Sequence, residues 1–236
     1  MKLVVDHSVF EKFLGVTLGV VIVKNCNNTA RTEELQNKLR FEEKRIQESF
    51  QPDTLSQHPF IDVWRKAYTA FGAKPKEHKS SVENLYRLVL GGKEVRSINT
   101  LVDLYNYISL KYMLPVGGED TDIVVGDIHL AIASENEPSV LLLGDKEPRT
   151  PHVGEVIYKD DTSAICRRWN WREADRTKLT ESTKNAILVI EALPPISRDV
   201  LEHAIKELKG LVEQFCGGNI AEHILDQEYP FVEIGN

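Results

Sequence analysis

The sequence predicts an α+β protein in which helices come first, short strands follow in series, and one long helix lies near the end. Hydrophobic residues recur at helical spacing in the first half of the chain, and after Asp122 the pattern changes to that of short strands. Because these strands do not alternate with helices, we expect a mixed or mostly antiparallel sheet. A chain of 236 residues can form one large domain, or one domain with a smaller appendage.

The first part of the chain predicts one buried strand and two amphipathic helices. Leu14–Val23 is rich in β-branched residues and too short to cross a bilayer, so we interpret it as a buried strand. Thr32–Phe50 and Pro59–Phe71 each place their apolar residues on one helical stripe. A polar break follows, and we expect residues 1–79 to pack on a core formed by residues 80–218.

Three further helices are predicted from their caps and apolar stripes. Ser80 opens a Ser-x-x-Glu capping box, which indicates a helix through about residue 90. Arg96–Tyr112 has apolar residues at helical spacing and is followed by proline and glycine. Arg198–Phe215 carries an unbroken apolar stripe, and Ser197 is its expected N-cap.

Turn residues divide the second half of the chain into short apolar segments. We expect residues 219–236 to form a C-terminal tail on the surface. The expected strands are Ile123–Val125, His129–Ala133, Val140–Leu143, Val153–Tyr158, Ala164–Trp171 and Ala186–Ala192.

Composition and motifs exclude several classes of function. The net charge of −7 argues against broad polyanion binding, so we expect no DNA partner, although a local basic site remains compatible with it. The three cysteines have no zinc or disulfide spacing, which favours a reducing, cytoplasmic location. Nucleotide-binding glycine loops, the nucleophile elbow and the zinc-protease motif do not occur, and no two histidines lie within four residues of each other. We therefore expect neither a cofactor nor a metal, and no membrane segment or signal peptide.

The stretch Cys166–Asn185 differs from the rest of the chain in charge. It contains six cations and three anions, and two tryptophans lie among its arginines. Guanidinium groups bind phosphates and carboxylates bidentately, and indole rings stack on bases or cations. The alternative is a half-buried strand whose arginine stems cover the tryptophan rings while their heads pair with local acids.

Two regions of the chain carry distinctive short motifs. Leu85–Leu110 contains Gly91-Gly92, Arg96-Ser97-Ile98, Val102-Asp103 and Asn106-Tyr107, with Pro115 after the helix. The later region contains Leu141-Leu142-Leu143-Gly144, Val156-Ile157-Tyr158 with Asp160, and Thr183-Lys184-Asn185 followed by Ala186–Val189. In this order the motifs resemble those of the B3/B4 editing domain of the bacterial phenylalanyl-tRNA synthetase β subunit, and the resemblance covers roughly residues 80–195, about half of the chain.

This resemblance implies a fold and a class of substrate. The implied fold is a three-layer β/β/α sandwich, here with additional N-terminal helices and a C-terminal helix. In the synthetase, the domain hydrolyses tyrosine mistakenly esterified to the tRNA for phenylalanine. The chain is far too short for a synthetase β subunit and shows no synthetase catalytic domain, so it is similar to a free-standing B3/B4 protein.

The sequence departs from the family pattern at three places near the implied pocket. Gly117 stands where the family carries a histidine, and Ile165–Glu173 replaces a glycine-rich strand. The family's catalytic-site glutamate falls on Val189, or on Glu191 if one gap is allowed. We therefore expect a pocket that is narrower, more cationic and more aromatic, with a different amino-acid specificity.

Two functions remain open from the sequence. The first is hydrolysis of a mischarged aminoacyl-tRNA ester in trans, and the second is a non-catalytic module that binds tRNA, a nucleotide or an amino acid. In either case the expected partner is tRNA or aminoacyl-tRNA, while the catalytic residue and the oligomeric state are left open. Arginines would hold phosphates or the carbonyl, a tryptophan would stack on the terminal adenine, and amide or hydroxyl groups would hold water or ribose. The predicted substrate-binding residues are Arg167, Arg168, Trp169, Asn170, Trp171, Arg172, Thr180, Thr183 and Asn106.

Overall fold

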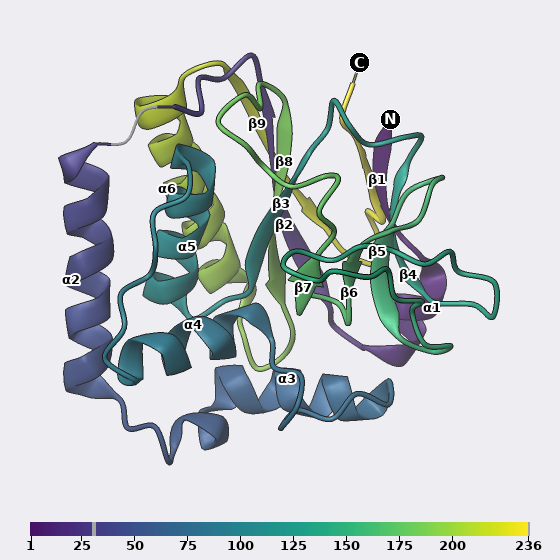
Figure 1. Ribbon diagram of the computed structural model, residues 1–236, viewed down its shortest axis with the longest axis horizontal. Helices are drawn as coiled ribbons and strands as arrows, with labels where there is room; N and C mark the ends of the chain where they lie inside the picture. The colour runs from purple at the N-terminus through teal and green to yellow at the C-terminus, as the bar shows by residue number, and fades with distance from the viewer. Residues whose placement is uncertain (30–31, 236) are drawn as a thin grey trace.

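The computed structural model describes residues 1–29 and 32–235. It consists of three layers: a group of helices, a four-stranded sheet in the middle and a six-stranded sheet on the other side (Figure 1). The predicted α+β class with two sheets and a helical layer is therefore confirmed.

The middle sheet is antiparallel throughout and has the strand order β3-β8-β2-β9. β2 lies inside it with both faces covered, which explains why its sequence is a continuous apolar run. Gly19 of β2 is needed there, because an added Cβ would lie 2.4 Å from the side chain of Ile205 on the covering helix. The strands are β2 (Thr17–Lys24), β3 (Val116–Asp120), β8 (Ala186–Ala192) and β9 (Asn219–Leu225).

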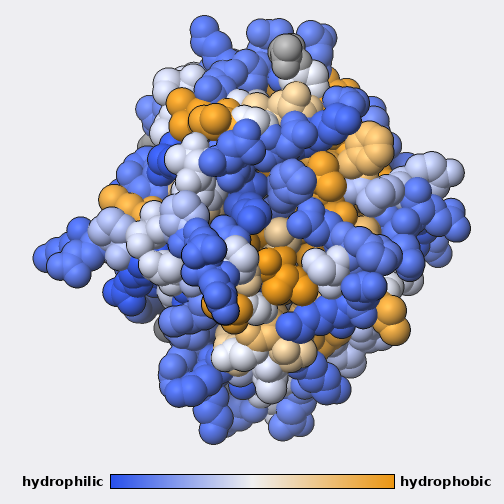
Figure 2. Space-filling view, turned by 90° about the vertical axis from the view of Figure 1, so that its right-hand side faces the viewer, coloured by the Kyte–Doolittle hydropathy of each residue, from blue (hydrophilic) through white to orange (hydrophobic). Residues whose placement is uncertain are grey.

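The outer sheet has the order β10-β1-β4-β5-β6-β7 and contains one parallel pair, β1 with β4. Viewed from the side of this sheet, the molecule is largely hydrophilic, with hydrophobic residues gathered near the middle of the face (Figure 2). The strands are β1 (Lys2–Val5), β4 (Ile128–Ile132), β5 (Val156–Lys159), β6 (Ala164–Arg167), β7 (Arg172–Glu173) and β10 (Phe231–Glu233).

Most helices cover the face of the middle sheet that is turned away from the outer sheet (Figure 1). Their N-caps follow the sequence: Ser80 and Ser197 accept hydrogen bonds from backbone N–H groups three residues on, as predicted. No helix in the described ranges is long and apolar enough to span a bilayer. The helices are α1 (His7–Lys12), α2 (Glu33–Ser49), α3 (Pro59–Ala70), α4 (Ser81–Leu90), α5 (Thr100–Tyr112) and α6 (Arg198–Cys216), with a 3₁₀ turn at Leu55–Gln57.

The C-terminal segment differs most from its prediction. Residues expected to form a surface tail instead form β9, which pairs with β2, and β10, which pairs with β1. Exposed and partly exposed residues alternate along β9, so its sequence lacks the continuous apolar run that marks β2. Edge strands of this kind are stabilised by their non-local partner, which the local sequence does not specify.

Three other segments also depart from their predictions. Ile123–Val125 is not a strand, and Val140–Leu143 makes only two isolated bridges, at Val140 and Leu142. The predicted strand Ala164–Trp171 ends at Arg167, because the backbone turns at the next two residues. β1, β3, β7 and α1 were not predicted, and α5 begins at Thr100 rather than at Arg96.

Candidate functional site

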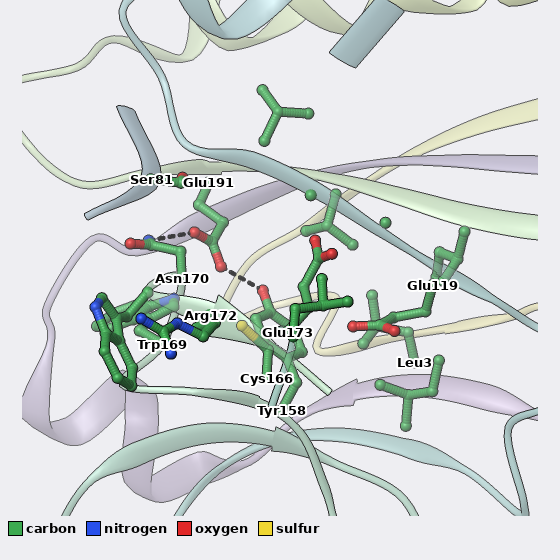
Figure 3. Close-up of a pocket in the computed structure, with 18 residues that line it drawn as sticks. Leu3, Ser81, Glu119, Tyr158, Cys166, Trp169, Asn170, Arg172, Glu173 and Glu191 are labelled. Atoms are coloured by element: carbon green, nitrogen blue, oxygen red, sulfur yellow. Dashed lines mark hydrogen bonds between the residues drawn. The ribbon is translucent and has the colours of Figure 1, made fainter. Parts of the chain in front are cut away.

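A cavity of about 230 Å³ lies between the two sheets. Both sheets contribute to its lining: β3 and β8 on one side, and residues of β1, β4, β5, β6 and β7 on the other. The segment from Trp169 to Glu173 closes one flank, and Ser81 at the start of α4 lies at the same end as Asn170 and Glu191 (Figure 3). Leu3 and Glu119 lie toward the other end of the group that Figure 3 draws.

Strand pairing explains which side chains of the middle sheet face this cavity. Gly117 lies opposite Val189, and Glu119 lies opposite Ile187. Because successive side chains of a strand point to opposite faces, Glu119 and Gly117 share one face, as do residues 187, 189 and 191. All five line the cavity, so the register of β3 and β8 brings Glu119 and Glu191 onto the same wall.

Glu191 is buried on this wall and is held at both carboxyl oxygens. The hydroxyl of Tyr158 donates to Oε1 at 2.6 Å, and Nδ2 of Asn170 donates to Oε2. Tyr68 in turn donates to Oδ1 of Asn170 at 2.9 Å, which fixes the amide orientation. Burial raises the pKa of Glu191 to about 7, although its hydrogen-bond donors favour the ionised form. A carboxyl with this pKa exchanges protons readily at neutral pH.

Two more carboxyls occupy the cavity. The side chain of Glu119 is 8% exposed, and its Oε2 has no hydrogen-bond partner among the described residues. Glu173 comes from β7, and the backbone N–H of Gly118 near its carboxylate favours the ionised form. Burial raises the pKa of both groups, and the nearby carboxylate of Glu173 raises that of Glu119 further.

The space beside Gly117 is filled by Glu173. A Cβ at position 117 would lie 3.1 Å from Oε1 of Glu173, closer than ordinary van der Waals contact. The position at which the resembled family carries a histidine is therefore occupied here by a carboxylate from β7. Glu173 thus stands above Gly117 in the middle of the β3–β8 wall.

A tight turn positions the arginines and tryptophans of the Cys166–Asn185 stretch. Arg168 and Trp169 both have left-handed backbone conformations, with φ of 49° and 65°, which non-glycine residues rarely adopt. Arg167 is 2% exposed and forms a bidentate ion pair with Glu155, at 2.9 and 2.8 Å. Glu155 also accepts a hydrogen bond from the backbone N–H of Arg168 at 3.0 Å, so one buried carboxylate fixes the start of the turn.

The two tryptophans of the turn have different surroundings. Trp169 is fully buried and packs edge-on against Phe13 and Trp64, at ring-centroid distances of 4.7 and 5.1 Å. Trp171 is partly exposed, and guanidinium groups of Arg168 and Arg172 each lie 4.5 Å from its ring centroid. Trp169 therefore belongs to the core and the wall of the cavity, whereas Trp171 offers a ring near its rim.

A second cavity of about 220 Å³ lies on the other side of this turn. Arg168 lines it together with Lys74, His78 and His152, and the acidic lining residues are Glu77 and Glu155. Glu155 is paired with Arg167, and Glu77 is paired with Lys74 at 3.3 Å, so Arg168 is left as the uncompensated charge of this space. Among the described residues, the guanidinium of Arg168 forms no ion pair, and burial lowers its pKa.

The remaining predicted site residues lie outside the first cavity. Thr183 donates to Asp120 at 2.6 Å, and its hydroxyl accepts a hydrogen bond from the backbone N–H of Thr180 at 2.9 Å. Both threonines thereby shape the loop that leads into β8, and Asn106 is buried on α5. Of the nine predicted residues, Trp169, Asn170, Trp171 and Arg172 line the first cavity, and Arg168 lines the second.

The expected cationic pocket is corrected by the structure. Among the described residues, Arg172 is the one arginine that lines the first cavity, and it is paired with Asp145 at 2.7 Å. Three glutamates line the same space, so its titratable groups are mostly acidic rather than basic. Arg167 turns inward because its partner Glu155 is supplied by the preceding strand connection, a non-local pairing that charge counting within one stretch overlooks.

The sequence did not predict Glu119, Glu173 or Tyr158 as cavity residues. Val116–Asp120 contains two glycines and looks unlike a strand, so nothing in the local sequence indicates that Glu119 faces a cavity. Cys166 also lines the cavity, and burial raises the pKa of its thiol well above the usual value, which disfavours a thiolate nucleophile. In the described ranges, no group of three or more histidine, cysteine, aspartate or glutamate side chains could hold a metal ion.

The two packed sheets, the helical layer and the enclosed cavity define a B3/4-type domain. Residues 63–217 match the B3/4 domain family, which is more than half of the chain, and the chain belongs to this family. The predicted resemblance is therefore confirmed.

Three relatives illustrate the range of this family likeness. The protein YhzB of Bacillus subtilis, described as uncharacterised, is 20% identical over 225 residues, covering 95% of this chain and all of that protein. The phenylalanine–tRNA ligase β subunit of Psychrobacter arcticus is 27% identical over 138 residues, which cover 55% of this chain and 17% of the subunit. An N-terminal fragment of the Pyrococcus horikoshii phenylalanyl-tRNA synthetase β subunit matches in structure with a TM-score of 0.46 and 13% identity, over 95% of this chain and 54% of the fragment.

Proposed function

We propose that this protein hydrolyses an aminoacyl ester of tRNA in trans, with Glu191 as the general base. The observation that carries the proposal is a buried carboxyl with a pKa of about 7, held between Tyr158 and Asn170 on the wall of a cavity. The chain covers less than a fifth of the ligase β subunit of Psychrobacter arcticus, so the activity is assigned to the B3/4 domain by itself.

The proposed reaction needs only one proton acceptor and a positioned water. The water oxygen attacks the ester carbonyl carbon while ionised Glu191 accepts a proton from the water. The bond between that carbon and the ribose oxygen then breaks, and the proton passes to the ribose oxygen. An ionised carboxyl has about four acceptor positions, so Glu191 can bind the water while keeping its bonds from Tyr158 and Asn170.

The charges of the two cavities favour an aminoacyl ester with its tRNA end. Carboxylates of the first cavity would attract the free ammonium of an aminoacyl group and repel a phosphate. The second cavity has the opposite character, because Arg168 lies there without an acidic partner among the described residues. Trp171 lines the first cavity, Arg168 lines the second, and the Arg168 guanidinium lies 4.5 Å from the centroid of the Trp171 ring. A tRNA end could therefore place a phosphate at Arg168 and its aminoacyl group in the first cavity.

Deacylation assays with a panel of mischarged tRNAs test the hydrolysis directly. We expect the Glu191→Gln variant to lose about 10² to 10⁴-fold in rate, the usual contribution of a general base. The rate of the unchanged protein should rise with pH through about 7, because the base acts in its ionised form. Glu213→Gln is the matched control, since Glu213 is exposed on α6 and lies outside both cavities.

Binding measurements test the phosphate contact independently of turnover. We expect Arg168→Ala to weaken tRNA binding about tenfold or more, as loss of a charge-assisted contact does, with Lys44→Ala on α2 as the control. Full hydrolytic activity in Glu191→Gln would refute the assigned base. Binding of tRNA without hydrolysis of any mischarged species would instead establish the non-catalytic module.

A further inference from the structure

The carboxyls of Glu119 and Glu173 line the same cavity as Glu191 but take no part in the proton transfer of the proposed hydrolysis. Glu119 is more than nine-tenths buried and lines the cavity, and the hydroxyl of Thr177 near its carboxyl favours the ionised form. Glu173 stands over Gly117, and the nearby backbone N–H of Gly118 favours its ionised form. Neither carboxyl forms an ion pair with another of the described residues. A buried carboxyl without a counter-ion is costly, which points to a cationic ligand.

The cations near this pair already have partners. Arg176 acts on Glu119 at a distance, but its own ion pair is with Asp160. Arg172 on the cavity wall is paired with Asp145. Around the two carboxyls the wall is apolar, with Leu3, Ile128 and Ile187 contributing side chains. Burial raises the pKa of both carboxyls, and an ammonium bound between them would favour their ionised forms.

We infer that the cavity selects an aminoacyl group whose side chain ends in a positive charge, with the charge bound between Glu119 and Glu173. The inference rests on the proposed function only in taking the guest to be an aminoacyl group. An ammonium of the lysine type is the chemistry that matches both features. Its flexible methylene stem suits the apolar wall, and its three N–H donors suit two carboxyls.

Spacing along β8 agrees with such a side chain. Glu173 stands above Gly117, and Gly117 is paired with Val189 of β8. Val189 and Glu191 are two residues apart, so Glu173 and Glu191 are separated by about 7 Å along the direction of β8. A four-carbon stem carries its ammonium roughly 6 Å from the Cα atom. With the ester beside Glu191, the α-ammonium would stay near that end, and a side-chain ammonium would reach Glu173. Figure 3 shows the three carboxyls along the cavity in the order Glu191, Glu173, Glu119.

Calorimetric titration with amino-acid amides tests the selectivity without any hydrolysable ester. L-lysinamide and L-norleucinamide share the α-ammonium and have similar stems, but norleucinamide lacks the terminal charge. We expect lysinamide to bind at least tenfold more tightly than norleucinamide and L-tyrosinamide. Glu119→Gln and Glu173→Gln should each reduce that preference to less than threefold, while Glu213→Gln leaves it unchanged.

The outcomes separate this inference from the proposed reaction. Equal affinities for the amides in the unchanged protein, or no detectable binding of lysinamide at millimolar concentration, would overturn the inference even if mischarged tRNA is hydrolysed. A preference for lysinamide without hydrolysis of any ester would support it and refute the proposed reaction. If the glutamine variants do not fold, the comparison of amides on the unchanged protein still decides the matter.

Discussion

Replacing Glu191 by glutamine should change the pH dependence of stability by a defined amount. Burial raises the pKa of Glu191 from the usual 4.5 to about 7, and at 1.36 kcal/mol per pH unit this corresponds to about 3.4 kcal/mol. The folded-state pKa lies above the unfolded one, so the folded protein binds more protons between these values. Stability is therefore lost as the pH rises through this window, and the full cost is present above about pH 7.

About 2.5 kcal/mol of this cost falls between pH 5 and pH 8. Glutamine cannot ionise, so the stability of Glu191→Gln relative to the unchanged protein should rise by that amount over the interval. Glutamine also sets its own N–H group against Asn170 or Tyr158, but that penalty is independent of pH and cancels in the comparison. Other titrating groups are common to both proteins and cancel as well.

Urea denaturation at pH 5, 6, 7 and 8 measures the effect, with the free energy of unfolding extrapolated to water. Glu213→Gln should track the unchanged protein at every pH, because Glu213 is exposed. A relative stability of Glu191→Gln that stays constant within 0.5 kcal/mol from pH 5 to pH 8 would refute the reasoning. Glu191 would then titrate at its ordinary pKa, and the main support for its role as a general base would be lost.

Further variants test the turn and the close packing of β3. Arg167→Met should destabilise the protein by about 3–5 kcal/mol in urea denaturation, because it leaves Glu155 buried and unpaired, and adding Glu155→Gln should restore much of that loss. A cost below 1 kcal/mol would contradict the buried ion pair. Gly118→Ala should lower stability by about 1–3 kcal/mol, because its Cβ would lie 2.5 Å from Leu188 and 2.9 Å from a backbone oxygen. Gly210→Ala is the control, because Gly210 lies on α6 with open space around it, and the substitution should raise stability by about 1 kcal/mol. A lower stability of Gly210→Ala, or a higher stability of Gly118→Ala, would contradict the packing described around these two glycines.

Local sequence patterns predicted the helices well, because their determinants lie within the helices themselves. The apolar stripe and Ser197 cap of Arg198–Cys216 are contained in a single segment of the chain. The strands were harder to predict, because their formation depends on partners that are distant in the sequence. β2 was predicted because burial on both faces leaves a continuous apolar run, whereas β9 and β3 carry no such run and are ordered by β2 and β8.

The sequence indicated where the candidate site lies, but it did not indicate the charge of the residues that line it. The family resemblance directed attention to Gly117, to Ile165–Glu173, and to Val189 or Glu191. Gly117, Val189, Glu191 and the part of the segment from Trp169 to Glu173 line one cavity in the structure. Charge could not be predicted in the same way, because it depends on which acids the arginines meet. Glu155 removes Arg167 from the cavity, and the register of β3 against β8 brings Glu119 into it. Neither pairing leaves a signal within a few residues of the side chain concerned.

The terminal strands bear on any attempt to excise the part of this protein that matches the family. A fragment cut at residues 63 and 217, the limits of the family match, would discard β1, β2, β9 and β10. The middle sheet would retain only β3 and β8, and the edge of β8 that pairs with β2 would be open to aggregation through its unpaired backbone groups. Dissection of this protein should therefore keep both ends of the chain, since we expect the matched region to aggregate when it is expressed alone.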